Sequence, residues 1–349
     1  MKKTQIGITA AMVLAVISAS AANSRGQTKL EDKGGLGRLI GNWIYTTDDG
    51  GTFDLSFKWG LNKHVVISRF EMAGRYSGFG LVYYDPAKGK IVHAGIDSVG
   101  GLGRGFWQVG DDKAVWKMNY VGPNSEQRKM GIVYTRSSAK TLKMEYFGLD
   151  DNGELAGEPQ RTTEFQRKAK VPAKKDKTRK KQPADSSAYT ALSGLVDTGG
   201  FDWIIGNWVT ATYEGQSFDV AYKWGMGKNL INMTSKGGEH EGLGMIFYAP
   251  EEGRVMHFGV DNQGGVTKGI WDADGDKLVA TLDFATLGGN SNKIAIVHTN
   301  IDAETINVAF YGVDESGGRS AEPWASLEYK RRARKTAAKL KSDNKPKTE

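Results

Sequence analysis

The side chains best suited to chemistry in this 349-residue sequence form one pattern that occurs twice, His93-x-Gly95-x-Asp97 and His257-x-Gly259-x-Asp261. Side chains alternate along a β-strand, so the histidine and the aspartate of each pattern would share one face. An imidazole and a carboxylate so placed could transfer protons, contact a polar ligand or help to hold a metal ion. Two ligands on one strand are too few for a tight metal site, so we assign no metal ligands and no catalytic residues.

The opposite face of each patterned strand is apolar. Val92, Ala94 and Ile96 occupy it in the first copy. Because an apolar face usually turns toward the core, we expect the histidine and the aspartate to face solvent, with the aspartate ending the strand at a Gly-Gly turn. If the interior is a polar pocket instead, these side chains are the best candidates for ligand binding, namely His93, Asp97, His257 and Asp261.

Four tryptophans are further candidate ligand contacts: Trp59, Trp107, Trp224 and Trp271. Ligand pockets are mostly apolar and aromatic, so these indoles could line a cavity. They could equally fill a core, because aromatic side chains contribute much of the buried apolar area in proteins. The sequence leaves the two roles open.

These recurrences belong to two copies of one module. Ile40–Trp43 returns as Ile205–Trp208 and Lys58–Gly60 as Lys223–Gly225, each displaced by 165 residues. From Tyr84 onward the displacement is 164, so one net deletion separates the copies. Such a long period predicts two modules with separate cores.

Each module is predicted to consist of short strands. Phe53, Leu55 and Phe57 alternate with polar residues, which indicates a strand with one apolar face. About ten such segments follow one another in a module, separated by turns rich in Gly, Asp and Asn, and only short helical turns over 36–39 and 201–204 precede the first strands. We therefore predict an all-β fold of two tandem antiparallel up-and-down β-barrels, about ten strands each, with a β-sandwich as the alternative.

A Gly-x-Trp element at the start of the first strand, Gly41-Asn42-Trp43, resembles that of the lipocalin and calycin barrels. Tyr84-Asp85-Pro86 and Asp97-x-x-Gly100-Gly101 look like uncharacterised bacterial lipocalin-like domains. The resemblance covers each module almost fully. It implies barrels that bind a small apolar molecule, with Trp43 and Trp208 as structural residues at the closed bottom.

Some ten-stranded relatives, of the nitrobindin type, bind haem through a histidine near the last strand. The stretches before Glu164-Phe165 and Glu328-Tyr329 contain no such histidine. We therefore predict no cofactor. The chain also has no cysteine, which excludes disulfides, thiolate metal sites and cysteine nucleophiles.

Residues 1–21 are predicted to be a signal peptide. Lys2 and Lys3 precede an apolar run from 6 to 17, and Ala19-Ser20-Ala21 is a small-residue cleavage site. The run is shorter than the ~20 apolar residues that a membrane helix needs. We expect a periplasmic or secreted protein with no transmembrane span after cleavage.

The remaining boundaries follow from composition. Module 1 is expected at 36–168, a basic linker at 169–198, module 2 at 199–332 and a basic tail at 333–349. Residues 166–183 hold nine Lys or Arg and one Asp, and residues 330–349 hold nine and two acids. We expect flexible, disordered segments that let the barrels move independently and contact anionic envelope surfaces weakly. No nucleic-acid partner is expected, because no aromatic residues interleave with these charges.

The favoured function is an exported, non-catalytic protein whose barrels bind a small apolar or amphipathic ligand. One alternative is an envelope interaction module with filled barrels. A less favoured alternative is an enzyme that uses the repeated His/Asp pairs as acid–base groups.

Overall fold

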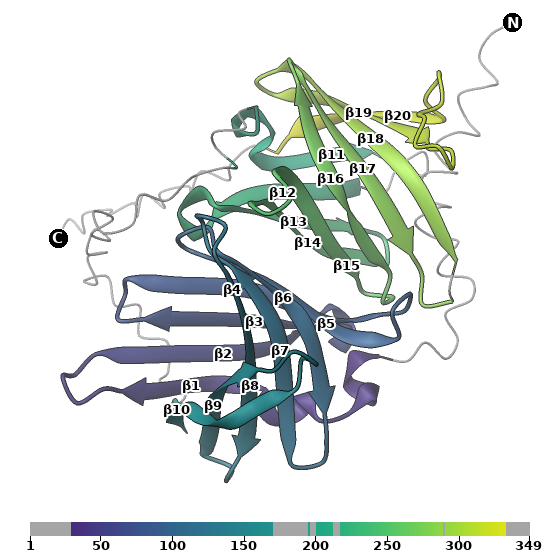
Figure 1. Cartoon of the computed structure of the whole chain (residues 1–349). Coiled ribbons are helices and arrows are strands. Elements are labelled where there is room, and N and C mark those ends of the chain that lie inside the picture. The colour runs from purple at the N-terminus through teal and green to yellow at the C-terminus, as the bar shows by residue number, and fades with distance from the viewer. Residues whose placement is uncertain (1–28, 170–194, 196–199, 212–216, 289, 333–349) are drawn as a thin grey trace, which may run out of the picture.

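The computed structural model describes residues 29–169, 195, 200–211, 217–288 and 290–332. The predicted signal peptide and tail lie outside this part of the chain, and so does the predicted linker apart from Ala169 and Leu195. Two barrels lie side by side, one from each half of the chain (Figure 1).

The first barrel closes ten antiparallel strands in sequential order, and the last strand pairs with the first. The strands are β1 (Gly41–Thr46), β2 (Thr52–Gly60), β3 (Val65–Met72), β4 (Tyr76–Asp85), β5 (Lys90–Asp97), β6 (Leu102–Val109), β7 (Lys113–Val121), β8 (Gln127–Arg136), β9 (Thr141–Leu149) and β10 (Leu155–Arg167).

The second barrel repeats this order and closure. Its strands are β11 (Gly206–Ala211), β12 (Ser217–Gly225), β13 (Leu230–Gly237), β14 (His240–Ala249), β15 (Arg254–Asp261), β16 (Val266–Asp274), β17 (Lys277–Ala285), β18 (Ser291–Asp302), β19 (Thr305–Gly312) and β20 (Ala325–Arg331). The predicted fold class, two closed antiparallel barrels of ten strands, is confirmed, and the sandwich is excluded.

A short 3-10 turn closes one end of each barrel. In the first barrel η2 (Leu36–Leu39) supplies buried leucines, and the Trp43 Nε1 donates to the Leu39 carbonyl oxygen at 2.8 Å. In the second, η5 (Asp202–Ile204) receives the Trp208 Nε1 on the Ile204 carbonyl at 2.7 Å. Both tryptophans are at most 1% exposed. Each indole thus satisfies its N–H while it fills the closed end.

The core of each barrel includes a leucine that precedes the expected module. Leu30 in η1 (Leu30–Lys33) and Leu195 are 165 residues apart, and both are 1% exposed. Leu30 belongs to the core cluster of the first barrel and Leu195 to that of the second. The repeat therefore extends further toward the N-terminus than the motifs alone indicate.

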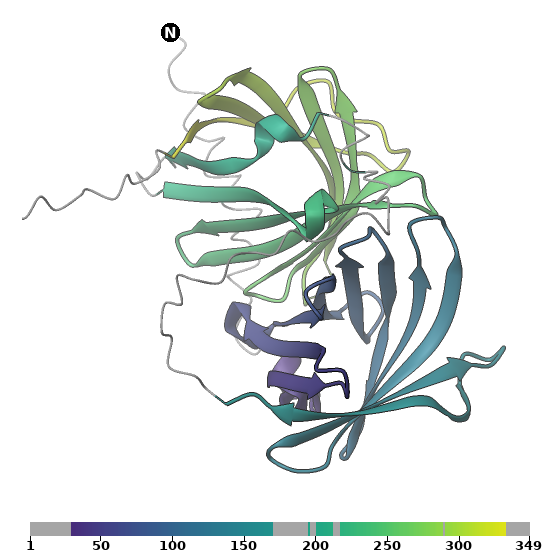
Figure 2. The same ribbon diagram turned by 90° about the vertical axis from the view of Figure 1, so that its left-hand side faces the viewer.

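The two barrels lie against each other (Figure 2), and a third apolar cluster joins them. It is built from the outer faces of β3 to β6 and of β13 to β16, and its members correspond in pairs between the copies. The pairs are Val65 and Leu230, Leu81 and Met245, Tyr83 and Phe247, Ala94 and Phe258, Ile96 and Val260, and Leu102 and Val266. The same patch on both partners is the geometry of a two-fold interface.

Polar contacts border this shared wall in the same two-fold manner. Arg104 on β6 pairs with Glu251 and, at 2.6 Å, with Glu252 in the β14–β15 turn. Its counterpart Lys268 on β16 pairs with buried Asp85 at the end of β4. The expectation that the linker lets the barrels move independently is therefore wrong, because they share a buried apolar wall.

The two barrels run in opposite directions along this wall. Asn229, at the closed end of the second barrel, donates from Nδ2 to the Ser98 carbonyl in the β5–β6 turn at 3.0 Å. His64, at the closed end of the first, lies against Gly264 in the β15–β16 turn. The end opposite the 3-10 turns in one barrel thus lies beside the closed end of the other.

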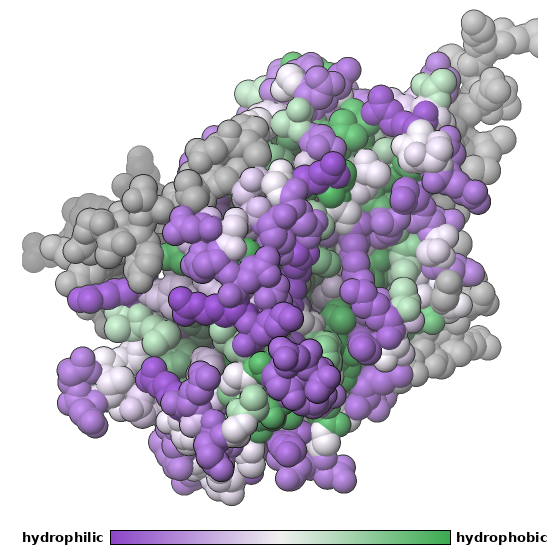
Figure 3. All heavy atoms as spheres, viewed as in Figure 1, coloured by the Kyte–Doolittle hydropathy of each residue, from purple (hydrophilic) through white to green (hydrophobic). Residues whose placement is uncertain are grey.

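Hydrophilic side chains cover most of the face seen in Figure 3.

The shared wall predicts a large loss of stability when it is truncated. Phe247 is fully buried and its ring stacks on Phe258 at 5.8 Å. Phe247→Ala should lower the free energy of unfolding by about 3–5 kcal/mol, measured by urea denaturation. Ile301→Ala is the control, because Ile301 is 58% exposed and its change should stay within ~0.5 kcal/mol. A loss below ~1 kcal/mol for Phe247→Ala would contradict a tightly packed interface.

Candidate ligand-binding cavities

Each barrel encloses a cavity, and the two differ in size. The cavity of the first barrel has a volume of about 770 Å³ and that of the second about 210 Å³. Pockets that bind drug-sized molecules span ~300–1,000 Å³. The first cavity falls within that range and the second falls below it, although the backbones of the two barrels correspond strand for strand.

The repeated histidines and aspartates line these cavities. His93 and Asp97 are 5% and 3% exposed, and His257 and Asp261 are 3% and 7% exposed. The expectation that they face solvent is wrong. The apolar face formed by Ala94 and Ile96 is indeed buried, but it packs against the other barrel, so the polar face turns inward.

The glycine of the repeated motif makes room for the imidazole. A Cβ on Gly259 would lie 3.0 Å from the His257 Nε2, and one on Gly80 of β4 would lie 2.2 Å from the His93 Nε2. One glycine therefore lies close beside the imidazole in each barrel, Gly80 on the neighbouring strand β4 in the first and Gly259 on β15 itself in the second.

Aromatic rings form a continuous stack on the wall of the first cavity. Trp107 of β6 and Trp116 of β7 lie parallel, with ring centroids 5.8 Å apart and planes 8° apart. His93 lies 4.0 Å from the Trp116 ring, and Tyr134 stacks on Trp107 at 5.7 Å. These four rings make this part of the cavity wall aromatic.

His93 is a neutral member of this stack. Its Nε2 lies 3.1 Å from the Ser68 hydroxyl, and its Nδ1 has no partner in the described part of the chain. Burial lowers the pKa of His93 to about 3. An imidazole with this pKa is a weak base, and no third group orients it toward Ser68. This serine–histidine contact therefore lacks the features of an activated nucleophile.

Asp97 holds a turn and two tyrosines together. Its Oδ1 accepts from the backbone N–H of Val99 at 3.0 Å and of Gly101 at 2.8 Å. Its Oδ2 accepts from the hydroxyls of Tyr76 at 2.6 Å and Tyr120 at 2.8 Å. The buried carboxylate is thus compensated by four donors. No hydrogen bond joins it to His93 within the described residues.

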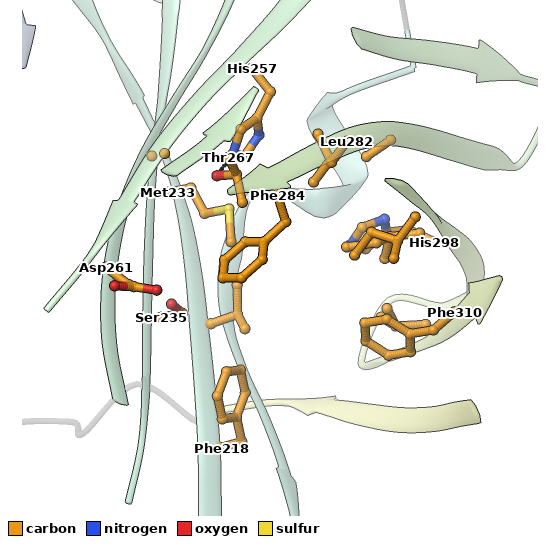
Figure 4. A pocket seen from close by; sticks show the side chains of 18 of the residues that line it. Phe218, Met233, Ser235, His257, Asp261, Thr267, Leu282, Phe284, His298 and Phe310 are labelled. Carbon is orange, nitrogen blue, oxygen red and sulfur yellow. Dashed lines mark hydrogen bonds between the residues drawn. The ribbon is translucent and has the colours of Figure 1, made fainter. Parts of the chain in front are cut away.

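The second cavity has the same aspartate and turn without the two tyrosines. Figure 4 shows its Asp261 together with Phe284, which stands at the position of Tyr120. Asp261 Oδ1 accepts from the backbone N–H of Gln263 at 2.8 Å and of Gly265 at 2.7 Å. At the positions of Tyr76 and Tyr120 the second copy has His240 and Phe284. The Asp–turn contact is therefore common to both barrels, whereas the tyrosine contacts belong to the first.

The imidazole in the second cavity is satisfied within the wall. His257 Nδ1 accepts from the Trp271 Nε1 at 3.2 Å, and its Nε2 lies 3.3 Å from the Thr267 hydroxyl. His298 takes the place of Tyr134 and lies 3.2 Å from the Tyr222 hydroxyl. Trp324 packs on Phe310 at 5.5 Å and lines this cavity, where the first barrel has Gln160. These contacts help to fill the second barrel.

The remaining candidate tryptophans lie at different depths. Trp107 and Trp271 line the two cavities. Trp59 packs against the first core, and the Trp224 Nε1 donates to the Asp202 carboxylate at the closed end at 3.1 Å. Neither of these two tryptophans is among the cavity-lining residues of its barrel.

Sequence reasoning missed several wall residues of the first cavity. They are Ser68, Tyr76, Trp116, Tyr120 and three arginines, Arg69, Arg75 and Arg128. The alternation around Trp107 could have indicated Trp116, because the two residues are directly paired across β6 and β7. The tyrosines carry no signal of their own until the inward direction of Asp97 is known.

The described residues lack two further features. No group of three or more His, Asp or Glu side chains there could hold a metal ion. No helix in that part of the chain is long and apolar enough to cross a membrane.

Comparisons with known proteins add little. No family model and no curated protein matches this chain. A structure from the DUF3598 family of Nostoc punctiforme PCC 73102, of unknown function, matches 84% of this chain and 96% of its own at 12% identity and a TM-score of 0.19. A tryptophan-to-alanine mutant of transferrin binding protein B from Haemophilus parasuis Hp5 matches 83% and 67% at 8% identity and a TM-score of 0.16. The fold assignment therefore rests on the strand pairing alone.

Buried histidines predict acid sensitivity. Burial lowers the pKa of His93 to about 3 and those of His257 and His298 to about 4. In the unfolded chain these groups take up protons near pH 6.5, whereas the folded barrels keep them neutral. Stability should therefore be full above pH 6.5 and fall as the pH drops toward 4.

A His93→Gln variant tests this sign. Below pH 6 the slope of unfolding free energy against pH should decrease by ~1.4 kcal/mol per pH unit, because one differential proton is removed. Urea denaturation between pH 4.5 and 7.5 measures the slope. Lys88→Gln, at an exposed turn, should keep the wild-type slope. Equal slopes for His93→Gln and wild type would contradict a neutral, buried His93.

Proposed function

We propose that this chain is an exported, non-catalytic binding protein whose first barrel holds one small apolar or amphipathic molecule. The observation that carries the proposal is the cavity of about 770 Å³, with Trp107, Trp116 and Phe57 on its wall. A cavity of this size with aromatic walls has room for a small molecule, whereas the cavity of the second barrel is smaller than ordinary ligand pockets. Export and weak envelope contact rest on segments outside the described residues and stay part of the proposal.

The second barrel is proposed to be the structural partner. Its cavity of about 210 Å³ is small, which is close to what the filled-barrel alternative expects. Its outer wall buries the apolar faces of β3 to β6, which would otherwise meet water. On this proposal the first barrel binds the ligand, and the second barrel stabilises the first.

The enzyme alternative receives less support. His93 contacts Ser68 and Asp97 contacts two tyrosines and a turn, so each group of the supposed pair is engaged elsewhere. A general base acts best with a pKa near the working pH, and that of His93 is about 3.

A cavity-filling variant tests the proposal. A Cβ on Gly103 would have its nearest neighbours at 3.5 Å or more, so a leucine there can project into the first cavity. Wild-type protein, purified from its own host without detergent, should lose one bound mass on denaturation in native mass spectrometry. Gly103→Leu should reduce the occupancy at least ~10-fold.

Thr267→Leu is the matched control, because Thr267 is the counterpart of Gly103 in the second cavity. It should keep the bound mass, and circular dichroism should confirm that both variants are folded. The proposal fails if the wild type carries no extra mass across growth conditions, or if folded Gly103→Leu retains it.

A further inference from the structure

We infer that the first cavity selects ligands with an anionic group, which binds at the arginine-bearing rim while the apolar body lies against the aromatic wall. This inference rests on the proposed function and adds the ligand class. Three observations support it. They are the positions of charged side chains along the cavity, the hydrogen bonds that the nearby acids already make, and the difference in charged lining residues between the two barrels.

Two exposed arginines line the cavity near the open end of the first barrel. Arg75 follows β3, and Arg128 lies at the start of β8; both are exposed and line the cavity. Arg69 also contributes to the lining, and its guanidinium lies 5.2 Å from the Phe79 ring centroid. None of the three has a carboxylate within ion-pair distance among the described residues. The rim thus offers guanidinium groups without internal acidic partners.

Two acids, Asp97 and Glu126, line the cavity near these arginines. Asp97 is buried and accepts four hydrogen bonds from two tyrosines and two backbone amides. Glu126 lines the cavity too, and its Oε2 accepts from the backbone N–H of Asn124 at 3.2 Å. The Arg69 guanidinium lies over Phe79, which packs with the wall shared by the barrels. Two exposed arginines, Arg75 and Arg128, and one exposed carboxylate, that of Glu126, therefore line the opening, and together these three side chains carry a net positive charge.

The second barrel lacks this charge. Among the described residues, no Lys or Arg lines its cavity. Glu239 and Asn292 stand at the positions of Arg75 and Arg128. The arginines are therefore not required by the barrel fold, because the second copy closes in the same way without them. They coincide with the larger cavity.

The deeper wall is suited to the rest of such a ligand. Below the rim the first cavity is lined by Trp107, Trp116, Met118, Ile132 and Met144. An apolar body there would be removed from water while the acid stays at the rim, where solvent and guanidinium groups both stabilise it. Guanidinium groups bind carboxylates, sulfonates and phosphates through two parallel hydrogen bonds, which favours an oxyanion over a neutral polar group.

Two fluorescent probes that differ by one charge test the inference on the full chain. 1-Anilinonaphthalene-8-sulfonate is anionic, and N-phenyl-1-naphthylamine has the same ring system without the sulfonate. For the wild type, fluorescence titration should give an affinity at least ~10-fold higher for the sulfonate. Added salt should weaken binding of the sulfonate more than binding of the neutral amine, because the arginines are exposed to solvent and salt screens their charge.

The variant Arg75→Gln/Arg128→Gln should bind the sulfonate ~10-fold more weakly and the neutral amine within ~2-fold of wild type. Lys88→Gln/Lys113→Gln is the charge-matched control, because both lysines are exposed at the closed end of the same barrel. It should bind both probes like the wild type.

The outcomes separate the two proposals. Equal wild-type affinities for the two probes, or an arginine variant that binds the sulfonate like the wild type, overturn the anionic selectivity and leave the cavity as a binding site. Gly103→Leu should abolish binding of both probes. If that variant binds them normally, or if neither probe binds the wild type, the proposed function fails and the selectivity fails with it.

Discussion

The apolar wall shared by the two barrels decides which side chains face the cavities. A strand has two faces, and β3 to β6 bury both of them, one inside their own barrel and one against β13 to β16. Because Leu81, Ala94 and Ile96 pack in the shared wall, the alternation of side chains turns His93 and Asp97 into the barrel. This packing therefore explains why the imidazoles are buried, why glycines lie beside them and why the aspartate contacts its turn from inside.

The shared wall also brings loops of the two barrels into contact. The β5–β6 turn of the first barrel lies against a closed-end loop of the second, where Ser98 contacts Asn229. The β15–β16 turn of the second barrel lies against the corresponding loop of the first, where Gly264 contacts His64. In both loops three consecutive residues have left-handed backbone torsions, 61–63 and 226–228. Such torsions are unfavourable for residues other than glycine, so the contact with the neighbouring barrel helps to stabilise them.

The fold could be predicted from the sequence because strand alternation, turn residues and the internal repeat all indicated the same structure. Alternation in β2, turns rich in glycine and the exact return of Ile-Gly-Asn-Trp all indicated repeated strands, and the ten-stranded barrels are present. The inward direction of His93 could not be inferred by the same rule, because an apolar face does not reveal what covers it. The run Phe79–Tyr84 contained a hint, since apolar residues on both faces of a strand are typical of burial on both sides. Arg75 lies in a turn and Arg128 at the start of a strand, where exposed charged residues are common, so only the cavity distinguishes them from ordinary surface residues.

The opposed direction of the barrels has a consequence for how the molecule can meet its surroundings. The open end of the first barrel lies beside the closed end of the second, and the reverse holds at the other side of the wall. A flat surface laid across the opening of the first barrel would therefore meet η6 (Met226–Lys228) of the second barrel and not its opening. The two openings point to opposite sides of the molecule, so one flat surface can cover only one of them at a time.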